Sequence, residues 1–216
     1  MARPDHNILP TEAWSDKEAC SDKEDWSGKK IGLLGGSFNP AHAAHLEISL
    51  VALEKLRLDA VWWLVSPQNP LKAPDDMAPL EARMETARRM ATDPRIFVTD
   101  LESRLGTRYS VDTVGRIISH WPDSHFVWLM GADNLAQFSK WKDWKKIART
   151  ITFAIFDRPG YSDAARTSDA ASYFRDDQIP PVQAARLVMK RPPAWVFIRD
   201  VENPLSSTEI RRKKLY

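Results

Sequence analysis

The chain has 216 residues, of which 43% are hydrophobic and 28% charged, a balance typical of one globular domain with a sizeable core. The formal net charge of +2 argues against a dedicated nucleic-acid binder. No apolar run approaches the roughly 20 residues that cross a bilayer, and the N-terminus lacks a signal pattern, so we expect a cytoplasmic protein without membrane partners. Cys20 is the only cysteine, so no internal disulfide and no cysteine-based zinc site are expected.

Residues 1–29 are polar and acidic and show no apolar periodicity. Up to Gly28 they contain seven acidic and three basic residues, which leaves the rest of the chain with a positive balance. We interpret residues 1–29 as a flexible extension and residues 30–216 as a single domain. The sequence gives no packing partner for Trp14 or Trp26. The positive balance of the domain suits small anionic substrates.

Residues 31–45, IGLLGGSFNPAHAAH, predict a strand, a glycine turn and a helix start in direct succession. Gly35 and Gly36 allow a sharp turn and leave room for a ligand against the backbone, and a helix N-terminus attracts anions. His42 and His45 are three residues apart, so we expect both imidazoles on one face, where they can reach the same phosphate. A simple turn, or half of a metal site, remains an alternative for these residues.

Further along the chain, apolar runs alternate with helical patterns. Strands are predicted at 60–65, 96–99, 125–130, 150–156 and 195–198. Helices are predicted at 46–56, 80–90 and 110–120 and around 145–146, with a helix and loops at 162–191. Ser110 is expected to cap the helix that it begins. The order of elements predicts an α/β fold, with a Rossmann-like, doubly wound, mainly parallel sheet and flanking helices.

Polar segments follow several of these strands, at the sheet edge where open α/β folds bind ligands. The loop 66–74, SPQNPLKAP, has Lys72 as its only cation. Gly131 predicts a tight strand exit, and Asp133 and Asn134 are placed to hydrogen-bond groups above the sheet edge. Arg158, in the turn DRPGY, could approach a ligand or cap the end of the sheet.

Near the C-terminus, residues 206–212, SSTEIRR, predict a second helix N-terminus suited to an anion. Ser206, Ser207 and Thr208 are cap candidates, and Arg211 follows one turn later. A capped surface helix without a ligand is the alternative.

Four strings resemble, in order, the motifs of the nicotinate-nucleotide adenylyltransferases, which belong to the nucleotidyltransferases with an HxGH-type motif. The strings are GGSFNPAHAAH, RYSVDT, GADNLAQFSKWKDW and LSSTEIR. Ala44 stands where many relatives have glycine, and Leu205 replaces a common isoleucine. The resemblance covers nearly everything but the extension and implies transfer of AMP from ATP to nicotinate mononucleotide. It is compatible with a monomer or a homo-oligomer, and the lack of a carboxylate cluster predicts Mg²⁺ carried mainly by ATP phosphates.

The resemblance also implies roles for individual residues. The catalytic residues would be His42, His45 and Arg211. ATP and its phosphates would contact Gly35, Gly36, Ser37, Phe38, Gly131, Asp133, Ser206, Ser207 and Thr208. The pyridine mononucleotide would contact Asn39, Lys72, Ser110, Trp141 and Arg158. Independently of the family, an indole offers a flat heteroaromatic ring a large contact area at little entropic cost.

Several other functions remain open. Nicotinamide mononucleotide or phosphopantetheine as the acceptor would keep the fold and the reaction. A non-catalytic nucleotide-binding module is disfavoured by the two histidines and Arg211. A redox dehydrogenase would need GxGxxG, which Gly32, Gly35 and Gly36 do not supply. A class I aminoacyl-tRNA synthetase shares the histidine motif, but no residues remain for an anticodon-reading domain.

Overall fold

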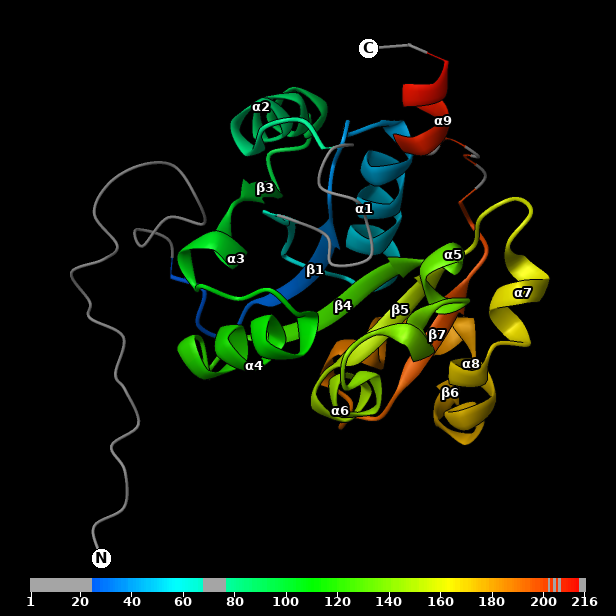
Figure 1. Cartoon of the computed structure of the whole chain (residues 1–216). Helices are drawn as coiled ribbons and strands as arrows, with labels where there is room; N and C mark the ends of the chain where they lie inside the picture. The colour runs from blue at the N-terminus through cyan, green and yellow to red at the C-terminus, as the bar shows by residue number, and fades with distance from the viewer. Residues whose placement is uncertain (1–24, 68–76, 202, 204, 206, 214–216) are drawn as a thin grey trace, which may run out of the picture.

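The computed structural model describes residues 25–67, 77–201, 203, 205 and 207–213. In this part of the chain, seven parallel strands form one sheet in the order β3-β2-β1-β4-β5-β7-β6 (Figure 1). The strands are β1 (Lys30–Gly36), β2 (Ala60–Val65), β3 (Ile96–Thr99), β4 (His125–Gly131), β5 (Thr152–Phe156), β6 (Gln178–Ile179) and β7 (Trp195–Ile198). The predicted doubly wound α/β fold is confirmed.

Helices connect the strands and flank the sheet (Figure 1). The α-helices are α1 (Ala43–Lys55), α2 (Leu80–Met90), α3 (Leu101–Arg104), α4 (Ser110–His120), α5 (Ala132–Leu135), α6 (Trp144–Thr150), α7 (Ser162–Arg166), α8 (Asp169–Tyr173) and α9 (Ser207–Arg212). The 3-10 helices are η3 (Phe138–Lys140), η4 (Arg175–Asp177) and η5 (Pro181–Met189). Among the described residues, no helix is long and apolar enough to span a membrane.

Three differences between the predicted and the observed elements have a clear physical reason. Strand β6 was not predicted, because two residues are too short to show an apolar period. Strand β5 begins two residues later than expected, since Thr150 ends α6. The predicted cap role of Ser110 is wrong: Tyr109 has the extended N-cap backbone, and Ser110 is already the first helical residue.

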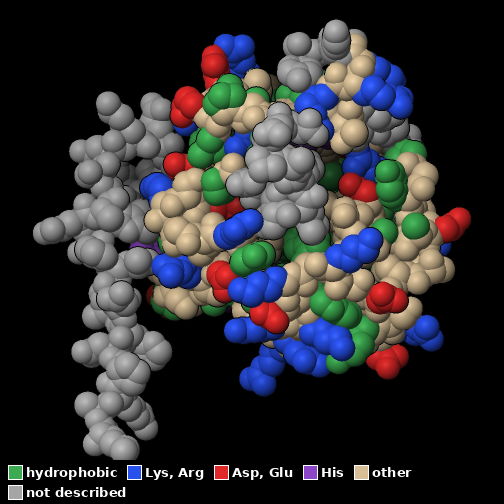
Figure 2. All heavy atoms as spheres, viewed as in Figure 1, with side chains coloured by type: hydrophobic (Ala, Val, Ile, Leu, Met, Phe, Trp, Pro, Cys, Tyr) green, Lys and Arg blue, Asp and Glu red, His purple; other side chains and the backbone are tan. Residues whose placement is uncertain are grey.

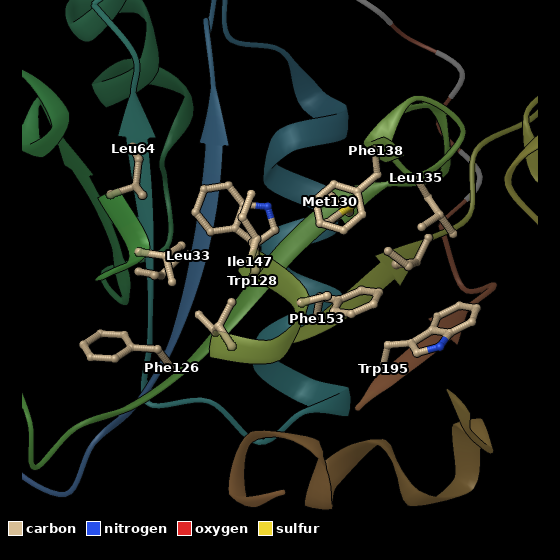
Figure 3. Close-up of a cluster of buried hydrophobic side chains, with 14 of the residues drawn as sticks. Leu33, Leu64, Phe126, Trp128, Met130, Leu135, Phe138, Ile147, Phe153 and Trp195 are labelled. Carbon is tan, nitrogen blue, oxygen red and sulfur yellow. The ribbon is translucent and has the colours of Figure 1, made fainter. Parts of the chain in front are cut away.

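Both faces of the sheet are buried, which explains why the strands read as continuous apolar runs. Adjacent residues of one strand point to opposite faces, so Leu33 belongs to one core and Leu34 to the other. The first core lies under α3, α4 and α6, and the second lies under α1, α2 and η5. Figure 3 shows Trp128 and Phe153, on adjacent strands, in the first core together with Phe138 and Ile147.

The last residues of the predicted extension belong to the domain. Trp26 is only 6% exposed, and its ring meets those of Trp62 and Phe97 edge-on, at centroid distances of 5.2 and 5.1 Å. The boundary placed after residue 29 is therefore too late, because Trp26 completes the first core. Trp14 and Cys20 lie outside the described residues.

Strand β1 lies between β2 and β4, and the chain builds the sheet outward from it in both directions. Such a switch point opens a crevice at the carboxyl ends of the two central strands, where α/β folds bind ligands. The register aligns Leu34 of β1 with Leu129 of β4. Gly35 and Gly131 therefore both lie at this edge of the sheet.

Candidate active site

A cavity of about 670 Å³ opens at the carboxyl ends of β1 and β4. This volume lies in the range of roughly 300–1,000 Å³ that small-molecule sites occupy. The predicted site residues that line it are Gly35, Gly36, Ser37, Phe38, His42, His45, Ser110, Gly131, Asp133, Trp141, Arg158, Ser207 and Thr208. The structure therefore brings motifs from both ends of the chain to one cavity.

Four predicted site residues are not found in the cavity lining: two lie outside it, and two lie outside the described residues. Asn39 and Arg211 are not among the described residues that line the cavity, and the Arg211 guanidinium donates to the Asn39 carbonyl. Asn39 is 3% exposed, and its side-chain oxygen accepts a hydrogen bond from the Ala78 N–H at 3.3 Å. Lys72 and Ser206 lie outside the described residues. Substrate contacts of these four residues stay predictions.

The turn after β1 is formed by a different residue than expected. Gly35 and Gly36 belong to the strand, and neither has a positive φ; the left-handed residue is Phe38, with a φ of 45°. A Cβ at Gly35 would lie 2.9 Å from the Trp128 ring, so glycine is needed there for packing. The sharp turn predicted at the two glycines is thus corrected to a turn at Phe38.

The Phe38 ring packs against two other rings. It is 1% exposed, stacks on Trp63 at 5.1 Å and contacts the His45 imidazole in a tilted arrangement at 4.6 Å between centroids. Trp63 is held in turn, because its indole N–H donates to the Ser49 hydroxyl at 2.7 Å. Burial of a large aromatic side chain offsets the cost of a left-handed backbone at a non-glycine residue. The Phe38 contact fixes one side of the His45 ring.

His45 is fixed by a hydrogen bond as well. His42 is the N-cap residue of α1, and its backbone N–H donates to Nδ1 of His45 at 3.1 Å. A nitrogen that accepts a hydrogen bond carries no proton, so the neutral imidazole of His45 is protonated on Nε2. His45 thus presents an N–H donor at the N-terminus of α1, where the helix dipole also favours an anion.

His42 and His45 lie side by side, as predicted, with ring centroids 3.9 Å apart. Burial, and to a lesser extent the charge of Arg158, lowers the pKa of His42 to about 4. His42 is therefore neutral near pH 7. Its Nδ1 atom is buried and has no hydrogen-bond partner among the described residues, while the residue itself lines the cavity.

Arg158 joins the ends of two strands. Its guanidinium pairs with the Asp133 carboxylate at 2.9 Å, and it also donates to the Leu205 carbonyl. A Cβ at Gly131 would lie 2.5 Å from an oxygen of Asp133, so a larger residue at position 131 would clash with this carboxylate. Arg158 lines the same cavity as His42 and His45, and its charge contributes to the lowered pKa of His42. Its contact with the mononucleotide stays a prediction.

Aromatic side chains line another part of the cavity. Trp141 is half-buried and meets Trp128 and Phe138 edge-on, at centroid distances of 6.4 and 5.3 Å. These contacts fix the plane of the Trp141 indole. Tyr109 and Ser110, at the start of α4, line the same cavity. A rigid indole beside small polar groups is suited to a flat heteroaromatic ring.

Helix α9 brings the C-terminal motif to the turn after β1. The Ser207 hydroxyl donates to the Pro40 carbonyl at 2.9 Å, and Arg211 donates to the preceding carbonyl, that of Asn39. Figure 1 shows α9 next to the start of α1. Residues about 170 positions apart in the sequence thus form one side of the site.

Several residues that line the cavity were not predicted. They are Glu102, Arg108, Tyr109, Gln137, Lys140 and Lys142, among others. Asn134, which was expected beside Asp133, also lines the cavity. Tyr109 lies in the RYSVDT string and could have been found there. Arg108, Lys140 and Lys142 also lie in the quoted strings, whereas Glu102 lies outside them and is indistinguishable in sequence from the many surface charges. Figure 2 shows Lys and Arg side chains gathered on the lower part of the visible face, over α4 and α6.

Two carboxylates that line the cavity take part in interactions within the protein. Asp133 pairs with Arg158, and Asp157 accepts hydrogen bonds from the Arg158 N–H at 2.7 Å and the Ser162 hydroxyl at 2.6 Å. Burial raises the pKa of Glu102 to about 7. No cluster of three or more His, Cys, Asp or Glu side chains suited to a metal occurs in the part of the chain described.

Comparisons with known proteins agree with this geometry. The cytidylyltransferase-like family matches residues 33–213. A Parvibaculum lavamentivorans protein named a probable nicotinate-nucleotide adenylyltransferase is 50% identical over 186 residues, which are 86% of this chain and 92% of that protein. A Cereibacter sphaeroides protein of the same name is 52% identical over 181 residues, 84% and 96% of the two chains.

A solved structure supports the fold. It is described as Plasmodium falciparum nicotinic acid mononucleotide adenylyltransferase complexed with NaAD. The TM-score is 0.63 at 19% sequence identity, and the match covers 85% of this chain and 83% of that chain. The same protein complexed with APC gives a TM-score of 0.61.

Proposed function

The chain belongs to the cytidylyltransferase-like family and, within it, to the nicotinate-nucleotide adenylyltransferases, and on this premise we propose the reaction that it catalyses. It transfers AMP from ATP to nicotinate mononucleotide and releases nicotinate adenine dinucleotide and pyrophosphate, a step of NAD biosynthesis. The observation that carries the proposal is that His42, His45 and Trp141 line one cavity at the switch point of the sheet.

The acceptor is its own nucleophile. A phosphate monoester has a second pKa of about 6, so the phosphate of the mononucleotide is mostly ionised at neutral pH and needs no general base. One of its oxygens forms a bond to the α-phosphorus of ATP, while the bond from that phosphorus to the bridging oxygen of the β-phosphate breaks. Catalysis therefore consists of alignment and charge stabilisation.

Residues of the turn after β1 and of α9 supply this stabilisation. The Nε2–H of His45 is directed at the charge that develops around the α-phosphorus, and His42 contacts the same triphosphate. Ser207 and Arg211 hold the departing pyrophosphate. A guanidinium has five N–H donors, so the bond from Arg211 to the Asn39 carbonyl leaves donors for phosphate oxygens.

The acceptor is recognised by its ring. The Trp141 indole covers the pyridine ring, and the start of α4 at Tyr109 and Ser110 lies beside the ring substituent. Because all three residues line the cavity that holds the histidine pair, the ring and the reacting phosphate fit in one continuous site.

Mg²⁺ is proposed to enter with ATP. Bound to phosphate oxygens, it supplies positive charge that offsets the negative charge of the triphosphate. The protein residues fit this arrangement, because the described carboxylates of the cavity form no metal cluster.

Pyrophosphate release tests the proposal. The full chain is incubated with ATP and Mg²⁺ and, in parallel, with nicotinate mononucleotide, nicotinamide mononucleotide or phosphopantetheine. We expect a strong preference for the first acceptor. Preference for another acceptor would overturn the assignment of the ring site, and no release from folded, ATP-binding protein would favour a non-catalytic module.

A further inference from the structure

Arg83 is a buried arginine on α2, a helix rich in Glu and Arg. It is 2% exposed, whereas Arg88 and Arg89 on the same helix are exposed. No carboxylate pairs with Arg83 among the described residues. Removing a charged group from water without an ion pair costs free energy, unless hydrogen bonds within the protein replace those to water. The hydrogen bonds of Arg83 therefore show how its charge is stabilised.

Four backbone carbonyls surround the guanidinium. Nε donates to Ala78 at 2.9 Å, and Nη2 donates to Pro67 at 3.0 Å. Nη1 donates to both Ser37 and Ser66, at 2.7 and 2.8 Å. Hydrogen bonds from a charged donor are about twice as strong as neutral ones. The planar fork of an arginine can satisfy carbonyls in several directions, and the shorter ammonium of lysine cannot reach them all.

These carbonyls belong to three segments at the edge of the cavity. Ser37 follows β1, Ser66 follows β2, and Ala78 precedes α2. Ser37 and Ser66 both line the cavity. The Ala78 N–H also donates to the side chain of Asn39, so Arg83 and Ala78 hold the same turn from one side. Helix α9 holds that turn from its other end.

The bond to Ser37 fixes the peptide that leads into Phe38. In a trans peptide the C=O and N–H point in opposite directions, so a carbonyl held against Arg83 turns the Phe38 N–H away from it. Phe38 has a left-handed backbone, and its ring contacts that of His45. A displacement of the Ser37 carbonyl would therefore change the position of Phe38 and, through it, of the His45 imidazole.

We infer that Arg83 is a positioning residue of the active site, which holds the turn after β1 in the conformation that places His45. The inference rests on the proposed adenylyl transfer, because its readout is turnover. Arg83 touches no reacting atom; it acts through Ser37 and Phe38. A misplacement on the order of 1 Å in a reacting group can cost about 100-fold in rate, so a loosened turn is expected to lower kcat more than it weakens substrate binding.

The test compares Arg83→Gln and Arg83→Lys with Arg88→Gln, a matched change on the same helix at an exposed arginine paired with Glu81. For each folded variant, kcat and the KM of ATP and of nicotinate mononucleotide are measured. We expect both Arg83 variants to lose kcat by about tenfold or more, with smaller changes in KM, and the control to match wild type. Amide exchange should rise in peptides that cover the turn and stay unchanged in α4.

The outcomes separate this inference from the proposed function. No turnover by the wild-type chain would contradict the proposed function, and wild-type turnover with unchanged kcat in both Arg83 variants would contradict the inference alone. Full activity of Arg83→Lys would show that charge suffices and would overturn the positioning role. A raised KM with normal kcat would overturn it too. Failure of both variants to fold would assign Arg83 to the fold instead of the site.

Discussion

Phe38 and His45 pack together with their ring centroids 4.6 Å apart and their planes tilted by 36°, so a left-handed turn residue directly supports a candidate catalytic side chain. The His42 N–H fixes the same imidazole through Nδ1. His45 is therefore held by a ring on one side and a hydrogen bond on the other. This preorganisation leaves its Nε2–H as the donor for a phosphate, with little reorganisation needed at the moment of reaction.

His45→Ala is expected to lower kcat severely while the fold stays intact. Removal of one preorganised donor to a developing charge costs about 100- to 1,000-fold in kcat. Pyrophosphate release under saturating substrates measures the loss, and circular dichroism checks the fold. His120→Ala, at the exposed end of α4, is the matched control. Near-normal turnover of His45→Ala would refute the role assigned to His45.

Trp141→Ala is expected mainly to raise the KM of nicotinate mononucleotide, because the indole is proposed to cover the pyridine ring. Loss of a ring contact of this kind costs about 1 kcal/mol, close to fivefold in KM. Initial rates measured with each substrate varied in turn separate the two KM values. Trp141→Phe should recover part of the loss, and an effect confined to the KM of ATP would contradict the stacking assignment.

The elements that sequence predicted best are those buried on both faces. Strands β2, β3 and β7 have the predicted bounds, because a fully buried parallel strand leaves an uninterrupted apolar run. The convergence of His42 and Ser207 was also predictable, but only through a resemblance that covers both ends of the chain. Their separation along the sequence offers no physical signal of contact.

The residues that sequence could not predict depend on tertiary context. Arg83 and Glu102 lie in segments rich in Glu and Arg, whose pattern is that of solvent-exposed helices, yet both are buried. Trp26 looked like part of a polar tail until its ring partners were known. The turn was assigned to Gly35 and Gly36 because glycine tolerates a positive φ, whereas packing against Trp63 and His45 lets Phe38 adopt it.

Binding of ATP is expected to be accompanied by proton uptake at His42. Burial and Arg158 lower the pKa of His42 to about 4 in the free protein, so it is neutral at pH 6. A triphosphate beside the imidazole would favour the protonated form and raise this pKa toward its ordinary value of about 6.5. Proton uptake should therefore be larger at pH 6 than at pH 8.

Titration calorimetry in two buffers of different ionisation enthalpy measures this uptake. His42→Asn should remove the part that belongs to His42, while His120→Asn, at the surface, should keep it. Equal uptake in wild type and His42→Asn at pH 6 would show that ATP does not change the protonation of this residue.

Glu102→Gln is expected to stabilise the fold in a pH-dependent way. Burial raises the pKa of Glu102 from 4.5 to about 7, against a smaller opposite effect of the hydrogen bond donated by Thr113. Between these two pKa values the folded state binds more protons than the unfolded state. The free energy of unfolding of the wild type therefore falls as pH rises from about 4.5 to about 7, and it is constant with respect to this group above that range. Glutamine stays neutral, so its advantage in the free energy of unfolding should grow across this window to at most about 3 kcal/mol.

Urea unfolding at pH 5 and pH 8 measures the difference, with the exposed Glu85→Gln as control. The same advantage at both pH values would show that Glu102 titrates in its ordinary range.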